Sequence, residues 1–209
     1  MNYIQGLKKR KNKIAVWGSG YIGLSTMAYY SKKKIKCVGF DIDKKKVDTI
    51  NSGNLPIKEL KDWFGFNIKS LVKKKYLQAT NNSNILSDNS FTVHFIAIPT
   101  EKNGKPFFKI LFNVLKKLVK IIKKKNKIKP VIIIESTLTP QCSEKKILPF
   151  FKKHNLVPGK DFIYGVAPRR DWFVEGTKSL VDIDRVFGST DIISSRIIST
   201  FSFDTLILT

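Results

Sequence analysis

Residues 13–24 read KIAVWGSGYIGL, and this stretch decides the fold. Ile14–Trp17 is a continuous apolar run of strand length, and Tyr21–Ser31 has the length and composition of a helix. Between them, Gly18–Gly23 has the spacing G-x-G-x-x-G. Strand, glycine-rich turn and helix in this order predict the first half of a βαβ unit.

Each glycine of the turn has its own physical task. Gly18 permits the tight turn, Gly20 lets the backbone approach a pyrophosphate, and Gly23 lets the helix pack closely on the strand. The amides at the start of the helix are free to bind phosphate oxygens. The spacing by itself also fits a glycine-rich turn without chemistry, but the strand before it and the helix after it favour dinucleotide binding.

Asp41 ends the next apolar run, about twenty residues after the turn. A carboxylate there accepts hydrogen bonds from the adenosine ribose hydroxyls, and it repels a 2′-phosphate. The sequence therefore favours NAD over NADP as cofactor. Lys44–Lys46 lie close enough to weaken that preference.

Short apolar runs alternate with helical stretches along the chain, which predicts an α/β fold with a Rossmann-type doubly wound parallel sheet. We expect one domain over residues 13–190, a basic segment over 1–12, and over 191–209 the start of a connector to a substrate domain that the chain lacks. The predicted strands are 14–17, 36–40, 76–79, 91–98, 131–134, 162–166 and 185–188. The predicted helices are 21–31, 43–51, 67–75, 109–125 and 141–154.

Composition narrows the possible partners. The formal charge is +23, from 39 Lys and Arg against 16 Asp and Glu, which by itself suggests an anionic partner. Only five of the 39 are arginine, the residue that phosphate and base-edge sites favour, so solvated lysines are a better explanation than a nucleic-acid face. Two cysteines form neither a disulfide framework nor a metal cluster, and they fit a reducing compartment. With no apolar run of about 18 residues, we expect no membrane span and a cytoplasmic location.

Three further segments follow predicted strands. They are Ile98–Thr100, Glu135–Pro140, and Pro168–Thr177, which leads on to Asp184–Gly188. In an open α/β sheet, ligands bind outside the carboxyl ends of the strands, so we expect all three segments near the glycine-rich turn.

With these segments, the sequence resembles the N-terminal half of the UDP-glucose/GDP-mannose dehydrogenase family from Lys13 to about Gly188. The shared motifs, in order, are G-x-G-Y-[IV]-G-L at Gly18–Leu24, F-D-I-D at Phe40–Asp43 and G-x-L-P-I-x-E at Gly53–Glu59. The resemblance implies oxidation of the C6 alcohol of a UDP- or GDP-linked sugar to a carboxylate, with two molecules of NAD.

The resemblance also implies roles for individual residues. Asp41 and Lys46 would contact the adenosine ribose end of NAD, and Thr100 and Ser136 would line the cofactor site. Thr137 would both line that site and position a water near the reacting carbon, since a hydroxyl can donate and accept hydrogen bonds. The pyrophosphate would lie on the glycine-rich turn, against Gly18, Gly20, Tyr21, Ile22 and Gly23.

The segment after Pro168 departs from the family pattern. An ungapped alignment places Asp171 where the family has a catalytic glutamate, and Arg170 where it has proline. Asp171 keeps the carboxylate but is one methylene shorter, a displacement of about 1 Å that matters in an organised site. Glu175 matches a second family acid that faces the substrate. Alternatively, Arg169, Arg170 and Asp171 form an ion-pair cluster on the surface.

The family's nucleophilic cysteine lies far downstream, beyond residue 209. A thiolate captures the aldehyde formed when an alcohol is oxidised to an acid. Cys142 starts a predicted helix, where a thiol pKa can fall, but we interpret it as a helix-entry residue and Cys37 as core packing. We expect His94 and His154 to be structural.

Three hypotheses follow. In the first, the chain is the cofactor half of a nucleotide-sugar dehydrogenase whose C-terminal half is encoded separately, on a partner chain, or is missing here by truncation. In the second, it is a standalone NAD-binding module without dehydrogenase activity. The third and weakest hypothesis is a nucleic-acid binder.

Overall fold

The computed structural model describes residues 3–124, 127–169 and 186–201. Its centre is a seven-stranded sheet, parallel except for its last strand, which pairs antiparallel with its neighbour. This confirms the predicted α/β fold. The strands, in order across the sheet, are β3 (Leu77–Thr80), β2 (Cys37–Phe40), β1 (Lys13–Trp17), β4 (Phe91–Ile96), β7 (Val131–Ile134), β8 (Ile163–Val166) and β9 (Gly188–Ser189).

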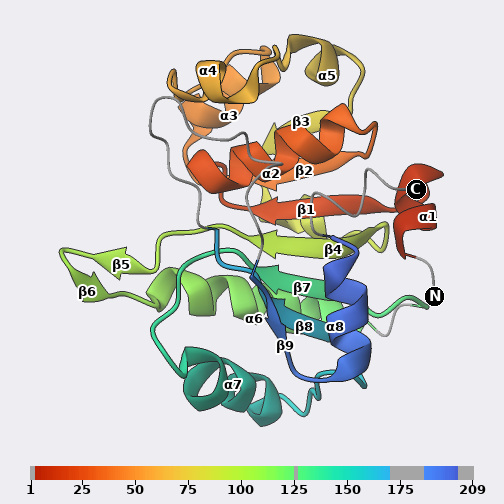
Figure 1. Cartoon of the computed structure of the whole chain (residues 1–209), viewed down its shortest axis with the longest axis vertical. Coiled ribbons are helices and arrows are strands. Elements are labelled where there is room, and N and C mark those ends of the chain that lie inside the picture. The colour runs from red at the N-terminus through yellow and green to blue at the C-terminus, as the bar shows by residue number, and fades with distance from the viewer. Residues whose placement is uncertain (1–2, 125–126, 170–185, 202–209) are drawn as a thin grey trace.

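Helices cover both faces of the sheet (Figure 1). On one face lie α2 (Tyr21–Lys32) and α8 (Ile192–Ser199). The other face carries α6 (Lys109–Lys123) and α7 (Leu148–Lys153). A π-helical turn, η2 (Ser143–Ile147), directly precedes α7.

The strands alternate their side chains between two cores. In β1, Ile14 and Val16 join the core under α2, and Ala15 and Trp17 join the core under α6. Every residue of β7 is buried, as a continuous apolar strand covered on both faces requires. The exposed side of α6 carries lysines and its other side is apolar, and the helix predicted at 109–125 is observed from Lys109 to Lys123.

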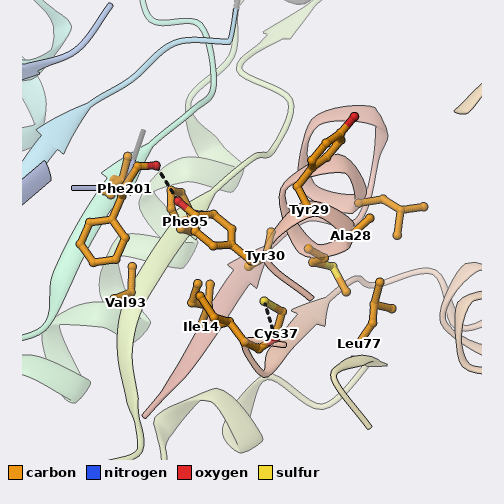
Figure 2. Close-up of a cluster of buried hydrophobic side chains, with 14 of the residues drawn as sticks. Ile14, Ala28, Tyr29, Tyr30, Cys37, Leu77, Val93, Phe95 and Phe201 are labelled. Carbon is orange, nitrogen blue, oxygen red and sulfur yellow. Dashed lines mark hydrogen bonds between the residues drawn. The ribbon is translucent and has the colours of Figure 1, made fainter. Parts of the chain in front are cut away.

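The core under α2 reaches the end of the described chain (Figure 2). The Tyr30 hydroxyl donates to the Phe201 carbonyl at 2.6 Å, and Phe95 packs against both rings. This core therefore joins α2, β4 and the segment after α8.

The helices between residues 41 and 75 agree only in part with the prediction. The helix expected at 43–51 is present as α3 (Lys44–Asn51), but the one expected at 67–75 is only the short α5 (Lys69–Lys73). Another short helix, α4 (Leu60–Phe64), precedes it and ends at Gly65 in the left-handed conformation.

Two small elements were not predicted. A hairpin of β5 (Glu101–Lys102) and β6 (Lys105–Pro106) follows β4, and its turn residues Asn103 and Gly104 both have positive φ. A 3₁₀ turn, η1 (Ser83–Ser87), connects β3 to β4 where a doubly wound fold usually has a helix.

The N-terminal segment contains a helix, α1 (Tyr3–Lys8), which buries Tyr3 and Leu7 in the core. The Tyr3 hydroxyl donates to the Lys129 carbonyl at 2.9 Å. At the other end, the strand expected at 185–188 is observed as β9 from Gly188, and Arg185 lies outside the described residues. Among the helices described, none has the length and apolar composition needed to cross a bilayer.

Candidate functional site

A cleft of about 610 Å³ opens at the carboxyl ends of the central strands. It lies where β1 and β4 are neighbours but the chain leaves them toward opposite sides of the sheet. This arrangement separates the loops after the two strands and leaves space between them for a ligand. The cleft is lined by Gly20, Tyr21, Ile22, Ala97, Ile98, Pro99, Thr100, Glu101, Glu135, Ser136, Thr137 and Arg169.

The three glycines of the turn have distinct surroundings. Gly18 has a φ of +96°, and a Cβ there would lie 2.3 Å from the Ala97 carbonyl oxygen. At Gly23 a Cβ would lie 1.9 Å from the Gly18 carbonyl oxygen, so only glycine allows this packing of α2. At Gly20 a Cβ would meet nothing within 4 Å. The backbone at Gly20 therefore faces open space rather than protein.

Gly20 is also the N-cap of α2, and no side chain caps the helix there. The first-turn amides and the positive end of the helix dipole are thus available to an anion. Because Tyr21 and Ile22 continue the cleft wall from this turn, a diphosphate fits against the backbone.

Asp41 is buried beside the turn. Its Oδ2 accepts from the Ser19 amide at 2.9 Å and from Lys46 Nζ at 3.1 Å, and its Oδ1 accepts from the Asp43 amide at 3.0 Å. Asp43 in turn caps α3 by accepting from the Lys46 amide. The structure thus brings the two residues predicted for the ribose end of the cofactor into one ion pair, and it fixes the carboxylate against the turn.

Ser136 and Thr100 use their hydroxyls to tie two loops of the cleft together. Ser136 Oγ accepts from the Ile98 amide at 2.9 Å and donates to the Ile98 carbonyl at 2.8 Å. Thr100 Oγ1 donates to the Thr137 carbonyl at 2.6 Å. Both residues line the cleft, as expected, but these hydroxyls already bind backbone. Thr137 also lines the cleft, and its side chain is exposed there.

A buried ion pair at the cleft was not predicted. Arg169 Nη1 lies 3.3 Å from Glu135 Oε1, and the two side chains are 2% and 4% exposed. A surface ion-pair cluster at residues 169–171 is therefore wrong for Arg169. The predicted catalytic Asp171 and the predicted substrate residue Glu175 lie outside the described residues.

Neither cysteine has the surroundings of a reactive thiol. Burial raises the pKa of Cys37 to about 12. Burial likewise raises the pKa of Cys142, although it stands at the start of a helical segment. His94 is fully buried in β4, where its Nδ1 accepts from Trp17 Nε1 at 3.3 Å and burial lowers its pKa to about 4.

Residues 12–201 match the model of the UDP-glucose/GDP-mannose dehydrogenase family, NAD binding domain. The chain belongs to this family. NAD is its cofactor, and the open backbone at Gly20, the uncapped α2 and the carboxylate of Asp41 fit that cofactor.

Relatives and solved structures agree with this assignment. The chain is 31% identical over 189 residues to the UDP-N-acetyl-D-mannosamine dehydrogenase of Campylobacter jejuni, an alignment that covers 85% of this chain and 43% of that protein. The enzyme of the same name from Methanococcus aeolicus is also 31% identical, over 87% of this chain and 39% of its own length. The structure of UDP-D-ManNAc dehydrogenase from Pyrococcus horikoshii matches with a TM-score of 0.78 at 25% identity, over 93% of this chain and 44% of that one. The chain thus spans less than half the length of these proteins.

Proposed function

We propose that this chain supplies the NAD-binding part of a dehydrogenase that oxidises the C6 alcohol of a nucleotide sugar to a carboxylate. The observation that carries the proposal is the open backbone at Gly20, set against the carboxylate of Asp41 in a chain of this family. The family supports a UDP- or GDP-linked sugar as the substrate class, and the relatives named above support a UDP-linked one.

In this proposal, the cleft binds the cofactor in an extended form. The first-turn amides of α2 bind the pyrophosphate, and Asp41 accepts from the adenosine ribose hydroxyls with Lys46 beside it. Bound NAD supplies a hydride acceptor. Thr100 and Ser136 fix the two loops that surround the nicotinamide end of NAD.

Three residues are proposed to face the substrate. The Thr137 hydroxyl, exposed at the cleft, orders a water near the reacting carbon. Asp171 supplies a catalytic carboxylate. Glu175 supplies a carboxylate that binds the substrate. Oxidation to the acid also needs a nucleophile for the aldehyde, and neither buried cysteine suits that role. We therefore propose that a C-terminal half, on a partner chain or in a longer form of this chain, supplies the nucleophile. Both cysteines are free, which supports a cytoplasmic location.

A standalone NAD-binding module is the second candidate, and the same observation on the cysteines favours it. Formation of NADH, followed by its absorbance, separates the two. Purified chain is mixed with NAD and either UDP-N-acetylmannosamine, UDP-glucose or GDP-mannose, alone and with the C-terminal half of the Campylobacter jejuni relative supplied in trans.

Sustained NADH formation that depends on the nucleotide sugar supports the dehydrogenase. NAD binding without turnover under every one of these conditions supports the module and contradicts the dehydrogenase.

A further inference from the structure

A buried polar network joins α2 to the carboxyl ends of β7 and β8. Arg169 Nη1 donates to Thr26 Oγ1 at 2.8 Å, and Thr26 Oγ1 donates to Glu135 Oε2 at 2.7 Å. The ion pair between Arg169 and Glu135 closes the triangle, and the Arg169 amide donates to the Glu135 carbonyl at 3.2 Å. Thr26 lies in α2, and Glu135 and Arg169 lie in the loops after β7 and β8, so the three residues meet only in the folded chain.

The network lies in the wall of the cofactor cleft. Glu135 directly precedes Ser136 and Thr137, and both Glu135 and Arg169 line the cleft together with Gly20 and Tyr21 of α2. The network therefore connects α2, whose first turn faces the cleft, to the loop after β7.

The order of the strands assigns this wall to one end of NAD. Asp41 follows β2, whereas Glu135 follows β7 and Arg169 lies just beyond β8, with β1 and β4 between the two groups. A dinucleotide with its adenosine ribose at Asp41 and its pyrophosphate on the turn after β1 extends toward β7 and β8 with its nicotinamide half.

Because the network is buried, removing only one of its two charges lowers the stability of the fold. Removing one partner of a buried ion pair leaves an uncompensated charge, whereas replacing both partners together is often neutral for stability. A gain in stability is thus a weak explanation for the ion pair between Arg169 and Glu135. Its place in the wall of the cofactor cleft is a better explanation.

We infer that Arg169 and Glu135 are positioning residues that set where the nicotinamide half of NAD lies relative to the turn of α2. The inference rests on NAD binding in this cleft. It concerns one half of the cofactor, so its effect is separable from that of a general loss of structure.

The test compares NAD with ADP, which carries the adenosine and diphosphate but no nicotinamide. The double variant Arg169→Met with Glu135→Gln removes both charges, and the amide carbonyl introduced at position 135 can still accept from Thr26. Calorimetry of both ligands and thermal unfolding are measured on the full chain. The control is Arg196→Met, which removes an arginine of α8, outside the residues that line the cleft.

We expect the double variant to keep its unfolding temperature and its ADP affinity and to bind NAD about tenfold more weakly. The single variant Arg169→Met is expected to unfold at a lower temperature because Glu135 loses the buried positive charge of Arg169. The control should match the unmodified chain in all three measurements.

Unchanged NAD affinity, or equal losses for ADP and NAD, would overturn the inference. An unmodified chain that binds neither ligand would overturn the cofactor site itself, and the inference with it.

Discussion

Gly20 and Gly23 have opposite structural constraints although they belong to one motif. At Gly20 a methyl group meets no protein atom within 4 Å and φ is −77°, so Gly20→Ala should fold normally and occupy space that a pyrophosphate needs. At Gly23 the methyl group collides with the Gly18 carbonyl. We expect Gly20→Ala to weaken NAD binding at least about tenfold with an unchanged unfolding temperature. Gly23→Ala should instead lower stability by about 1–3 kcal/mol. Calorimetry and thermal unfolding of both variants check this, and a stable Gly23→Ala protein would contradict it.

Asp41 is the residue whose charge discriminates between the two nicotinamide cofactors. In Asp41→Ser, repulsion of a 2′-phosphate disappears and Lys46, now without its carboxylate at 3.1 Å, is left facing that phosphate. We expect NAD affinity to fall and the ratio of NADP to NAD affinity to rise about tenfold or more. Titration with each cofactor measures the ratio, and the variant Lys46→Met in the same background should reverse the gain. A ratio that stays constant in Asp41→Ser would show that Asp41 does not contact the ribose.

At the scale of single elements, β4 carries a built-in pH dependence through His94. Its pKa is about 4 in the folded chain and about 6.5 when unfolded, so the unfolded state binds the proton more readily. The full stability is present above about pH 6.5 and is lost as the pH falls toward 4, by roughly 3 kcal/mol in total. Asp88 and Asp191, whose hydrogen bonds to Ser90 and Ser194 lower their pKa values, add a loss at still lower pH.

Denaturant unfolding at a series of pH values between 4 and 7 measures this effect. His94→Gln keeps an acceptor near Trp17 Nε1 but does not titrate, so its stability should change much less over the same range. Equal pH dependence in both proteins would assign the effect to other groups.

Elements whose pattern is continuous were predictable from the sequence, and elements that depend on pairing were not. The continuous apolar run Val131–Ile134 predicts a buried strand, and the helical spacing of the apolar residues in α6 predicts a helix. The dipeptide Asn103-Gly104 is a strong signal for a tight hairpin turn, but the two-residue strands on either side have no apolar alternation to support it. The helix expected at 67–75 is short: Leu71 and Val72 are only partly buried against the core, and Lys75 has a positive φ that an α-helix does not continue through.

The candidate site likewise has parts that the sequence predicts and parts that it does not. The glycine-rich turn and Asp41 were predictable because their spacing is set by one βαβ unit. Glu135 and Arg169 are 34 residues apart, and their contact exists only because β7 pairs with β8. No local spacing rule connects them, so the sequence indicated neither the buried network nor the tie between Ser136 and Ile98.

At the scale of the whole molecule, the charge of +23 needs an explanation other than the cofactor site. Lysines 109, 116, 117, 120 and 123 lie on the exposed side of α6, and Arg169 is buried in an ion pair. Lysines solvated in this way attract nucleic acid without reading it. We expect only weak binding of duplex DNA at physiological salt, with the same affinity for different sequences, measured by fluorescence anisotropy. Tight binding that weakens steeply as salt is added would support the nucleic-acid hypothesis.

Calorimetry of the purified, folded chain with NAD is the most direct test of the cofactor site. We predict one site per chain, with an affinity that falls at least about tenfold in Gly20→Ala and is unchanged in Arg196→Met. No heat at millimolar NAD from protein that unfolds cooperatively would contradict it, because the open backbone after β1 would then serve no dinucleotide.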